Sequence, residues 1–370
     1  MIAFHLPKKD FQGFHIVASH SDSPTYRIKE QPEMSVEKHY TKLNIERYGG
    51  MIPETWFDRP LSVAGRIIIE ENGQIKDQLV NVDRDLMIIP NLAIHMSRSS
   101  NESKQLNPQK DLLPLCGGNL TKDGFEEMIA KESGVEKEDI LSYDLFLYNR
   151  MRGTTLGINE EFVAAPKLDD LECAYSSIEG MLNAKLSKDY VTVCAVFDNE
   201  EVGSGTKQGA GSTFFPEVLK RISYLCGKNE EEYYMAVADS FMLSADNAHA
   251  VHPNYQDKTD PTNRPYINEG IVLKYNASQK YTTDANSAAL VKYLCKKEKI
   301  KCQVFFNRSD MLGGSTLGNI LTGQVSIKAA DIGLPQLSMH STYETAGCKD
   351  LDDMITLMGS FYELGKEVQI

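Results

Sequence analysis

Residues 190–201 read Tyr-Val-Thr-Val-Cys-Ala-Val-Phe-Asp-Asn-Glu-Glu, an apolar run that ends in an acidic cluster. A run of this length, rich in β-branched and aromatic residues, is typical of a buried strand. Three other runs also lead to polar side chains: Phe14–Ser19 before His20, Tyr233–Ala238 before Asp239 and Asp246, and Val325–Ala330 before His340. The sequence therefore predicts four buried strands with chemistry-bearing residues beyond their ends.

Helical patterns separate these runs, over Leu171–Leu186, Ala285–Lys297 and Leu351–Glu367. Strands that alternate with helices favour an α/β fold, with a mainly parallel sheet flanked by helices on both faces. Ligands of such sheets bind at the carboxyl ends of the strands. The polar clusters are predicted to lie at those ends.

The stretch from residue 33 to residue 151 has a different pattern. Val63–Glu70 and Gln78–Val82 resemble the two strands of a hairpin, and Asn72-Gly73 is the turn dipeptide between them. We expect residues 33–151 to form an inserted β-rich domain. The catalytic domain would then be discontinuous, comprising residues 1–32 and 152–370.

Two shorter predictions fall inside this insert. A helical pattern covers Lys122–Glu132, and the polar stretch Ser99–Lys110 is predicted to be a loop.

Composition narrows the class of protein. The net charge of −13 disfavours binding to nucleic acid or to an anionic membrane surface, and no apolar run is long enough to span a bilayer. The seven cysteines are scattered and form no Cys-x-x-Cys pair, which favours free thiols over disulfides or a cysteine-based zinc site. We expect a cytoplasmic protein.

Two strand-end motifs contain candidate metal ligands. In His20-Ser21-Asp22, the aspartate is placed to orient the imidazole of His20. In Leu168-Asp169-Asp170-Leu171, either aspartate is placed at the start of a helix, where capping is the simpler explanation.

The acidic cluster Asp198-Asn199-Glu200-Glu201 is costly to bury without a compensating cation. Two adjacent glutamates can divide the work, because one can bind metal while the other serves as general base. A solvated loop would explain the same residues without any catalytic role.

The stretch around Asp246 adds two of the chain's eight histidines, His249 and His252. His340 follows the last predicted strand, and the Gly313-Gly314 turn resembles a loop of backbone donors beside a reacting carbonyl. Taken one at a time, these motifs have ordinary structural explanations. Together they provide histidines and carboxylates for two zinc-like ions with one bridging aspartate.

The ordered motifs resemble the aspartyl aminopeptidase and aminopeptidase I family of dinuclear zinc peptidases from residue 13 to the C-terminus. The motifs are His-Ser-Asp-Ser-Pro (20–24), Leu-Asp-Asp-Leu (168–171), Asp-Asn-Glu-Glu-Val-Gly-Ser (198–204), His-Ala-Val-His-Pro-Asn-Tyr (249–255) and Pro-Gln-Leu-Ser-Met-His-Ser (335–341). Trp56–Arg59 and Leu92–His95 in the insert are also similar to the family. The most specific motif is the one that begins at His249.

The resemblance implies an exopeptidase that removes N-terminal residues from peptides with a free N-terminus. Two divalent metal ions are implied, zinc first, with cobalt or manganese as alternatives. The implied ligands are His20, Asp169, Glu201, Asp246 and His340, with Asp169 bridging both ions. Glu200 would be the general base, and Asp22 would orient His20.

Further roles follow from the same resemblance. His249 would contact substrate, and Lys274 would favour N-terminal Asp or Glu. Gly313 and Gly314 are substrate-binding candidates on the pattern of their own turn, which could also be a plain turn. His95 would enter the active site of a neighbouring subunit, since the family forms homo-oligomers built from dimers, up to a dodecamer.

One departure concerns the N-terminus, because family members generally have several dozen residues before the strand at Phe14. The chain starts almost at that strand, so we expect either a shortened version, with consequences for stability and assembly, or a true start upstream. Two other functions stay open: a related two-zinc carboxypeptidase or deacylase, and an inactive metal-stabilised assembly protein.

Overall fold

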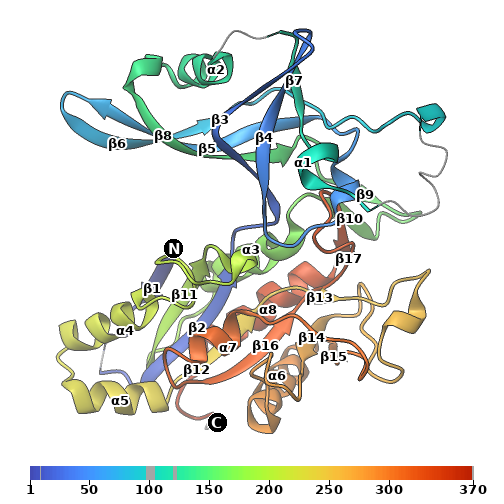
Figure 1. The fold of residues 1–370 in the computed structure, drawn as a ribbon. Helices are drawn as coiled ribbons and strands as arrows, with labels where there is room; N and C mark the ends of the chain where they lie inside the picture. Colours follow the sequence, from blue (N-terminus) through green and yellow to red (C-terminus); the bar gives the residue numbers. More distant parts are fainter. Residues whose placement is uncertain (9, 97–104, 120–122, 369–370) are drawn as a thin grey trace. The chain divides into compact units, whose positions relative to one another are not determined.

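The computed structural model describes residues 1–8, 10–96, 105–119 and 123–368 and divides the chain into two compact units (Figure 1). The α/β unit comprises Met1–Ser23, Thr154–Met339 and Glu344–Ile370. The β-rich unit comprises Pro24–Gly153 and His340–Tyr343. In the described ranges, no helix has the length and apolar composition that crossing a membrane requires.

A seven-stranded sheet forms the centre of the α/β unit, in the order β1-β11-β2-β12-β16-β14-β15. Its strands are β1 (Ile2–His5), β2 (Gly13–His20), β11 (Tyr190–Phe197), β12 (Phe241–Ala245), β14 (Ile271–Lys274), β15 (Cys302–Phe305) and β16 (Lys328–Gly333). Four of its six pairings are parallel; only β1 with β11 and β14 with β16 are antiparallel. The predicted mainly parallel sheet is confirmed.

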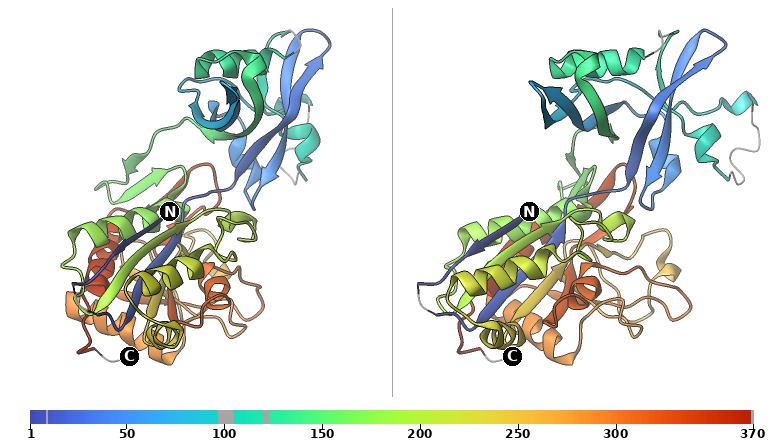
Figure 2. Two further views of the ribbon diagram at one scale, coloured as in Figure 1. Left: turned by 90° about the vertical axis from the view of Figure 1, so that its left-hand side faces the viewer. Right: turned by 60° about the vertical axis from the view of Figure 1, so that its left-hand side comes forward.

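Helices cover both faces of this sheet (Figure 2). One apolar cluster packs the sheet against three helices: α3 (Leu168–Asn183), α6 (Ala285–Glu298) and α8 (Asp350–Tyr362). A second cluster packs the other face against α4 (Phe214–Leu225), α5 (Glu230–Ala238) and α7 (Leu317–Thr322). Along β2 the side chains alternate between the two clusters: Val17 belongs to the first, Ile16 and Ala18 to the second. This two-sided burial explains why β2 and β11 are continuous apolar runs.

The parallel register brings several strand ends to one edge of the sheet. Phe197 at the end of β11 pairs with His20 at the end of β2, and Ser244 near the end of β12 pairs with Ala18. The segments that follow β2, β11 and β12 therefore leave the sheet on the same side.

One predicted strand was wrong. Tyr233–Ala238 lies in α5, where the Asn229 side chain and Glu232 form a capping box that starts a helix. The strand that leads to Asp246 is β12, which begins three residues after Ala238. The aromatic and apolar residues of 233–238 suit a buried helix as well as a strand, and the cap decides between them.

A second, five-stranded sheet in the same unit has the order β13-β17-β18-β10-β9. Its strands are short: β9 (Thr154–Leu156), β10 (Phe162–Ala165), β13 (Ala248–His249), β17 (Pro335–Leu337) and β18 (Glu344–Gly347). This sheet continues from β12 into β13 and from β16 into β17, so it extends the edge where the polar motifs lie.

The β-rich unit contains a six-stranded sheet in the order β6-β5-β8-β3-β4-β7. Its strands are β3 (Thr25–Val36), β4 (Tyr40–Tyr48), β5 (Leu61–Glu71), β6 (Gln74–Asn81), β7 (Leu115–Gly117) and β8 (Ile140–Asn149). The predicted hairpin is β5–β6, and Asn72 and Gly73 in its turn both have positive φ. β3 runs without a break across the predicted domain boundary at residue 33.

The helix predicted over Lys122–Glu132 corresponds to α2 (Gly124–Ser133), while Lys122 itself lies outside the described residues. Within the predicted loop Ser99–Lys110, residues 99–104 also lie outside them. Pro108–Asp111 forms the short helix α1, which the Asn107 side chain caps.

Two glycines at the contact between α3 and α8 provide a matched test of the packing that holds α3. A Cβ on Gly180 would lie 2.9 Å from the Met358 Cβ and 3.2 Å from the Ile355 carbonyl oxygen, whereas a Cβ on Gly359 would meet nothing closer than 3.6 Å. We expect Gly180→Ala to lower the free energy of unfolding by about 1–3 kcal/mol, because overpacking outweighs the gain in helix propensity. Gly359→Ala should be neutral or stabilising by up to about 1 kcal/mol. Chemical denaturation measures both, and equal effects would contradict the packing.

Candidate metal centre

A group of buried side chains lies at the shared edge of the parallel strands. His20, Asp169, Asp170 and Asp246 each place one potential ligand atom within 4.8 Å of the others. All four residues are at most 9% exposed. His20 also forms such a group with Glu200 and Glu201.

His20 is the last residue of β2 and is 1% exposed. Its Nε2 lies 3.7 Å from Asp169 Oδ1, and its Nδ1 lies 3.1 Å from the carbonyl oxygen of Asp22. Burial opposes the charged imidazolium, but the carboxylates of Asp170, Asp22 and Asp169 outweigh it and raise the pKa of His20 well above its usual value. The surroundings of His20 therefore favour a positive charge.

Asp22 connects His20 to the turn that carries the two glutamates. Its Oδ1 accepts a hydrogen bond from the backbone N–H of Glu200 and its Oδ2 one from that of Glu201, both at 3.1 Å. The same carboxylate lies 3.4 Å from His20 Nδ1. One side chain thus fixes both the imidazole and the glutamate turn.

Asp169 and Asp170 belong to the first turn of α3, where both have non-helical backbone angles. The Asp169 N–H donates to Glu344 Oε2 at 3.0 Å, and Asp170 Oδ2 accepts from the His20 N–H at 3.1 Å. Asp170 Oδ1 is buried without a hydrogen-bond partner, and burial raises the pKa of Asp170 well above its usual value. A carboxylate in this state is poorly compensated by the protein alone.

Glu200 and Glu201 form a single 3-10 turn directly after β11. Burial, with the charges of Asp246 and Asp169, raises the pKa of Glu200 to about 7. Burial and the charge of Asp169 raise the pKa of Glu201 to about 10. Glu200 therefore titrates near neutral pH, which suits a group that must both accept and release a proton.

Asp246 follows β12 and lies beside a buried lysine. The Lys274 Nζ donates to the backbone oxygens of Asp246 at 2.7 Å and Asn247 at 3.1 Å, and it lies 3.7 Å from Asp246 Oδ2. Burial raises the pKa of Asp246, although the ammonium acts in the opposite direction. Lys274 is 2% exposed and lies 5.1 Å from the ring centroid of Tyr281.

His340 follows the α/β unit's Met339 directly in the chain. It begins the segment His340–Tyr343, which groups with the β-rich unit, and its carbonyl oxygen accepts from the Ile52 N–H at 3.1 Å. Its backbone φ of 65° is unusual for a residue with a side chain. Ser338 and Met339 separate this segment from the end of β17 at Leu337. The chain rejoins the α/β unit at Glu344, whose side chain accepts from the Asp169 N–H.

The other predicted site residues are less buried. His249 is exposed at the end of β13, with its ring 6.1 Å from that of Phe305. Gly313 lies against Asn307, and a Cβ there would meet Asn307 Nδ2 at 1.9 Å, whereas Gly314 is open. His95 is exposed in the short helix Ile94–Met96 of the β-rich unit.

Sequence reasoning did not identify two buried partners of the cluster, Glu344 and Asn247. Both are at most 3% exposed and hydrogen-bond to α3, close to Asp169. Asn247 follows the predicted ligand Asp246 in the sequence, and this position could have identified it as a candidate. Nothing in the local sequence of Glu344 indicates its contact with a residue 175 positions away.

The donor set of the cluster fits a divalent cation of the zinc type. One imidazole and several carboxylates are ligands that zinc accepts, and the described cysteines are not among the ligand groups. The raised pKa values of four neighbouring carboxyls share one physical cause, burial of like charges, which a cation would relieve. The residues present therefore suit a metal site.

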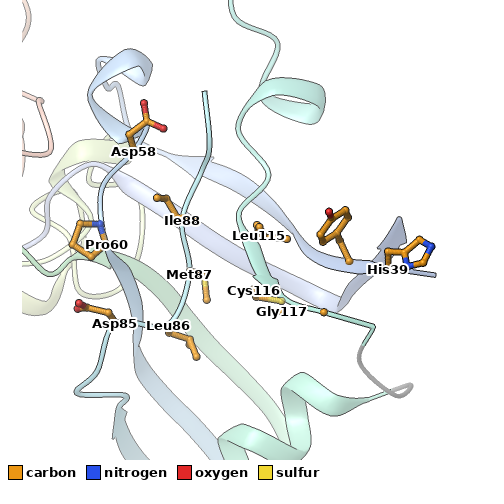
Figure 3. Close-up of a pocket in the computed structure, with 12 residues that line it drawn as sticks. His39, Asp58, Pro60, Asp85, Leu86, Met87, Ile88, Leu115, Cys116 and Gly117 are labelled. Carbon is orange, nitrogen blue, oxygen red and sulfur yellow. The ribbon is translucent and has the colours of Figure 1, made fainter. Parts of the chain in front are cut away.

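A different hollow lies in the β-rich unit (Figure 3). Its volume is about 620 Å³, and its lining includes Met87, Ile88, Leu115 and Cys116. Its lining shares no residue with the ligand groups found among the described residues.

Comparisons with known proteins agree over nearly the whole chain. A family model described as Aminopeptidase I zinc metalloprotease (M18) matches residues 1–362. A probable M18 family aminopeptidase 2 from Clostridium acetobutylicum is 46% identical over 361 residues, which cover 95% of this chain and 83% of the relative.

Solved structures agree with the sequence comparison. A cryo-electron microscopy structure of the Ape4 and Nbr1 complex matches with a TM-score of 0.93 at 36% identity, covering 98% of this chain and 74% of that chain. The mApe1 dodecamer of S. cerevisiae matches with a TM-score of 0.84 at 27% identity, covering 98% and 82%.

The raised pKa values predict how the metal-free protein responds to pH. A carboxyl whose pKa is raised by folding stabilises the protein below its unfolded-state pKa and loses that contribution as pH rises through the folded-state value. Between pH 7 and 9, the raised pKa values of Glu201 and His20 both lower the free energy of unfolding as pH rises. The free energy of unfolding should fall by an amount on the order of 1 kcal/mol per pH unit. Buried His15, whose pKa is lowered by burial to about 3, contributes no slope in this window.

Urea denaturation of chelator-treated protein at several pH values measures this slope. Glu201→Gln should reduce it, as should saturation with zinc. A metal-free stability that is constant or rises from pH 7 to pH 9 would contradict the electrostatic description of the cluster.

Proposed function

The chain belongs to the aminopeptidase I (M18) family of zinc metalloproteases and is a metal-dependent aminopeptidase, and we propose that a pair of metal ions at the strand-end cluster performs its chemistry. The observation that supports this proposal is the convergence of three proposed ligands, His20, Asp169 and Asp246, which are buried with ligand atoms within 4.8 Å of one another.

In this proposal Asp169 would be a ligand of both ions. His20 and Asp246 hold one ion, and both have ligand atoms within 4.8 Å of that of Asp169. Glu201 and His340 hold the other. His340 follows Met339 by one peptide bond, so the chain itself keeps it within about 4 Å of the α/β unit, measured between Cα atoms.

Zinc bound there supplies Lewis acidity, which polarises a peptide carbonyl and makes water acidic enough to attack near neutral pH. Glu200 then takes the proton of the attacking water on its carboxylate. Glu200 would then pass this proton to the departing amine. Asp22 keeps Glu200 in place through the backbone, because it holds the N–H groups of Glu200 and Glu201 together.

The acidic edge also explains why an exopeptidase is expected. A substrate's free α-amino group would be held at the metal pair and by the carboxylates near it. An internal peptide bond lacks this group. We therefore propose that cleavage releases the N-terminal residue.

We further propose a preference for N-terminal Asp or Glu, through Lys274. Two hydrogen bonds of its ammonium go to backbone oxygens, which leave the formal charge in place. The Asp246 carboxylate at 3.7 Å would share its own charge with a bound metal ion. A net positive potential at this buried position favours a carboxylate in the substrate and penalises an apolar side chain.

Assembly is part of the proposal as well. Because the related mApe1 of S. cerevisiae is a dodecamer, we propose that this chain forms homo-oligomers through the β-rich unit, with residues 33–151 as the assembling domain. The exposed His95 would then act in a neighbouring subunit.

Replacement of the proposed base separates catalysis from metal binding. Glu200→Gln should lower kcat by about 10²–10⁴, because the amide cannot accept a proton, while zinc content per chain stays unchanged. The measurements are steady-state hydrolysis of aminoacyl anilides and elemental analysis of the same preparation. Glu217→Gln, an exposed change on α4, is the matched control. Activity retained in Glu200→Gln would eliminate Glu200 as the base.

The proposed specificity is tested by comparing kcat/KM on Asp-, Glu- and Leu-anilides. We expect the acidic substrates to be preferred, and Lys274→Met to reduce that preference while retaining some hydrolysis. A wild-type enzyme that hydrolyses Leu-anilide much faster would refute the acidic preference. Release of C-terminal residues from a peptide would point to a carboxypeptidase, and zinc binding without any hydrolysis to an inactive assembly protein.

A further inference from the structure

The side chain of Asn247 occupies the centre of a buried polar network beside the candidate metal centre. Asn247 is 3% exposed and joins β12 to β13. Its Nδ2 lies 2.9 Å from Gln336 Oε1 and 3.1 Å from both the Leu168 carbonyl oxygen and Glu172 Oε2. Its Oδ1 accepts from Cys173 Sγ and from the Leu334 N–H, each at 3.3 Å.

These contacts connect three segments that carry the proposed metal ligands. Leu168, Glu172 and Cys173 belong to α3, whose first turn contains Asp169. Leu334 and Gln336 lie at β17, the strand that leads toward His340. Asn247 itself follows Asp246 directly. One carboxamide therefore fixes the spacing of segments that are far apart in the sequence.

The backbone at Asn247 is held by a second residue, Lys274 on β14. The Lys274 Nζ donates to the backbone oxygens of Asp246 and Asn247, so the peptide units on both sides of the Asn247 Cα are anchored to β14. With the side chain bound to α3 and β17, the position of Asp246 is determined by contacts on all three elements.

Only a neutral group that both donates and accepts satisfies this network. Three oxygens share the two N–H bonds of Nδ2, and the two partners of Oδ1 are themselves donors. An aspartate would place its oxygens against the Leu168 carbonyl oxygen and Gln336 Oε1 with no proton to donate, and it would bury a further charge. An alanine would leave buried groups without partners.

We propose that Asn247 is a positioning residue of the metal centre, which sets the distance between Asp246 and Asp169 and thereby the affinity for zinc. The inference rests on the proposed function, since it concerns the same metal pair. Asn247 contacts neither the ions nor the substrate in this account, and its effect passes through the ligands on either side.

The test measures zinc affinity rather than activity. Purified full-length protein is stripped of metal, and the zinc dissociation constant is determined by competition with a chromogenic chelator. We expect Asn247→Ala to weaken zinc binding by about 10- to 100-fold, the range typical of residues that support metal ligands. The melting temperature of the metal-free protein is measured in parallel, because a merely structural role would change that temperature alone.

Gln303 provides a matched control. Its carboxamide also joins separate segments, since it accepts from the Tyr266 N–H and donates to the carbonyl oxygens of Tyr266 and Gly270, and none of these partners is a candidate ligand. Gln303→Ala should lower the melting temperature and leave the zinc dissociation constant within about threefold, a change worth about 0.65 kcal/mol.

Gln336→Leu keeps the inference testable if Asn247→Ala does not fold. It removes one acceptor of Asn247 at a residue whose own Nε2 has no hydrogen-bond partner, and it should weaken zinc binding in the same direction by a smaller factor. Zinc affinity unchanged in the folded variants would overturn the role of Asn247. Failure of the wild-type protein to bind zinc would instead overturn the proposed function.

Discussion

Several carboxyl groups with raised pKa values share one small, largely buried volume, and the electrostatic cost of that arrangement is the constraint on which the structure of the α/β unit depends. Asp169 and Asp170 at the start of α3 and Asp246 after β12 come from two distant segments, yet they lie within a few ångströms of His20. Like charges in a medium of low dielectric repel strongly, so either protons or cations must compensate them. Protonation at the raised pKa values is the first solution, and the metal ions proposed above would provide the second.

The fold brings the charges together and then limits their movement. Parallel pairing delivers the ends of β2, β11 and β12 to one edge. Asp22 fixes the turn of Glu200 and Glu201, and Lys274 fixes the backbone at Asp246. These supports use backbone N–H and C=O groups more than the ligand side chains. Holding the ligand segments through the backbone is the arrangement expected of a preorganised metal site.

The sequence predicted those parts of the structure that local patterns specify. The apolar run 190–197 predicted β11 because a strand buried on both faces is apolar throughout. Asn72-Gly73 predicted the turn between β5 and β6 because this dipeptide is typical of hairpin turns. The strand before Asp246 was misplaced onto Tyr233–Ala238, where the capping box of Asn229 favours helix. The actual strand, Phe241–Ala245, has five residues, and apolar periodicity alone does not distinguish so short a run as strand or helix.

The candidate site was predictable as a set of motifs but not as a network. His20, Glu200 and Asp246 stood out because polar residues ended apolar runs. The contact of the Asp169 N–H with Glu344 spans 175 positions, and the amide of Asn247 selects its partners only in the folded chain. Long-range hydrogen bonds of this kind depend on tertiary packing, and no local pattern encodes them.

The most direct test of the metal centre is anomalous X-ray diffraction from zinc-loaded crystals, recorded on both sides of the zinc absorption edge. The account predicts two anomalous peaks at the strand-end cluster, both within about 2.0–2.2 Å of Asp169 carboxylate oxygens and one at a similar distance from His20 Nε2. Zinc-loaded crystals with no peak at this cluster, or with zinc held elsewhere, would contradict it.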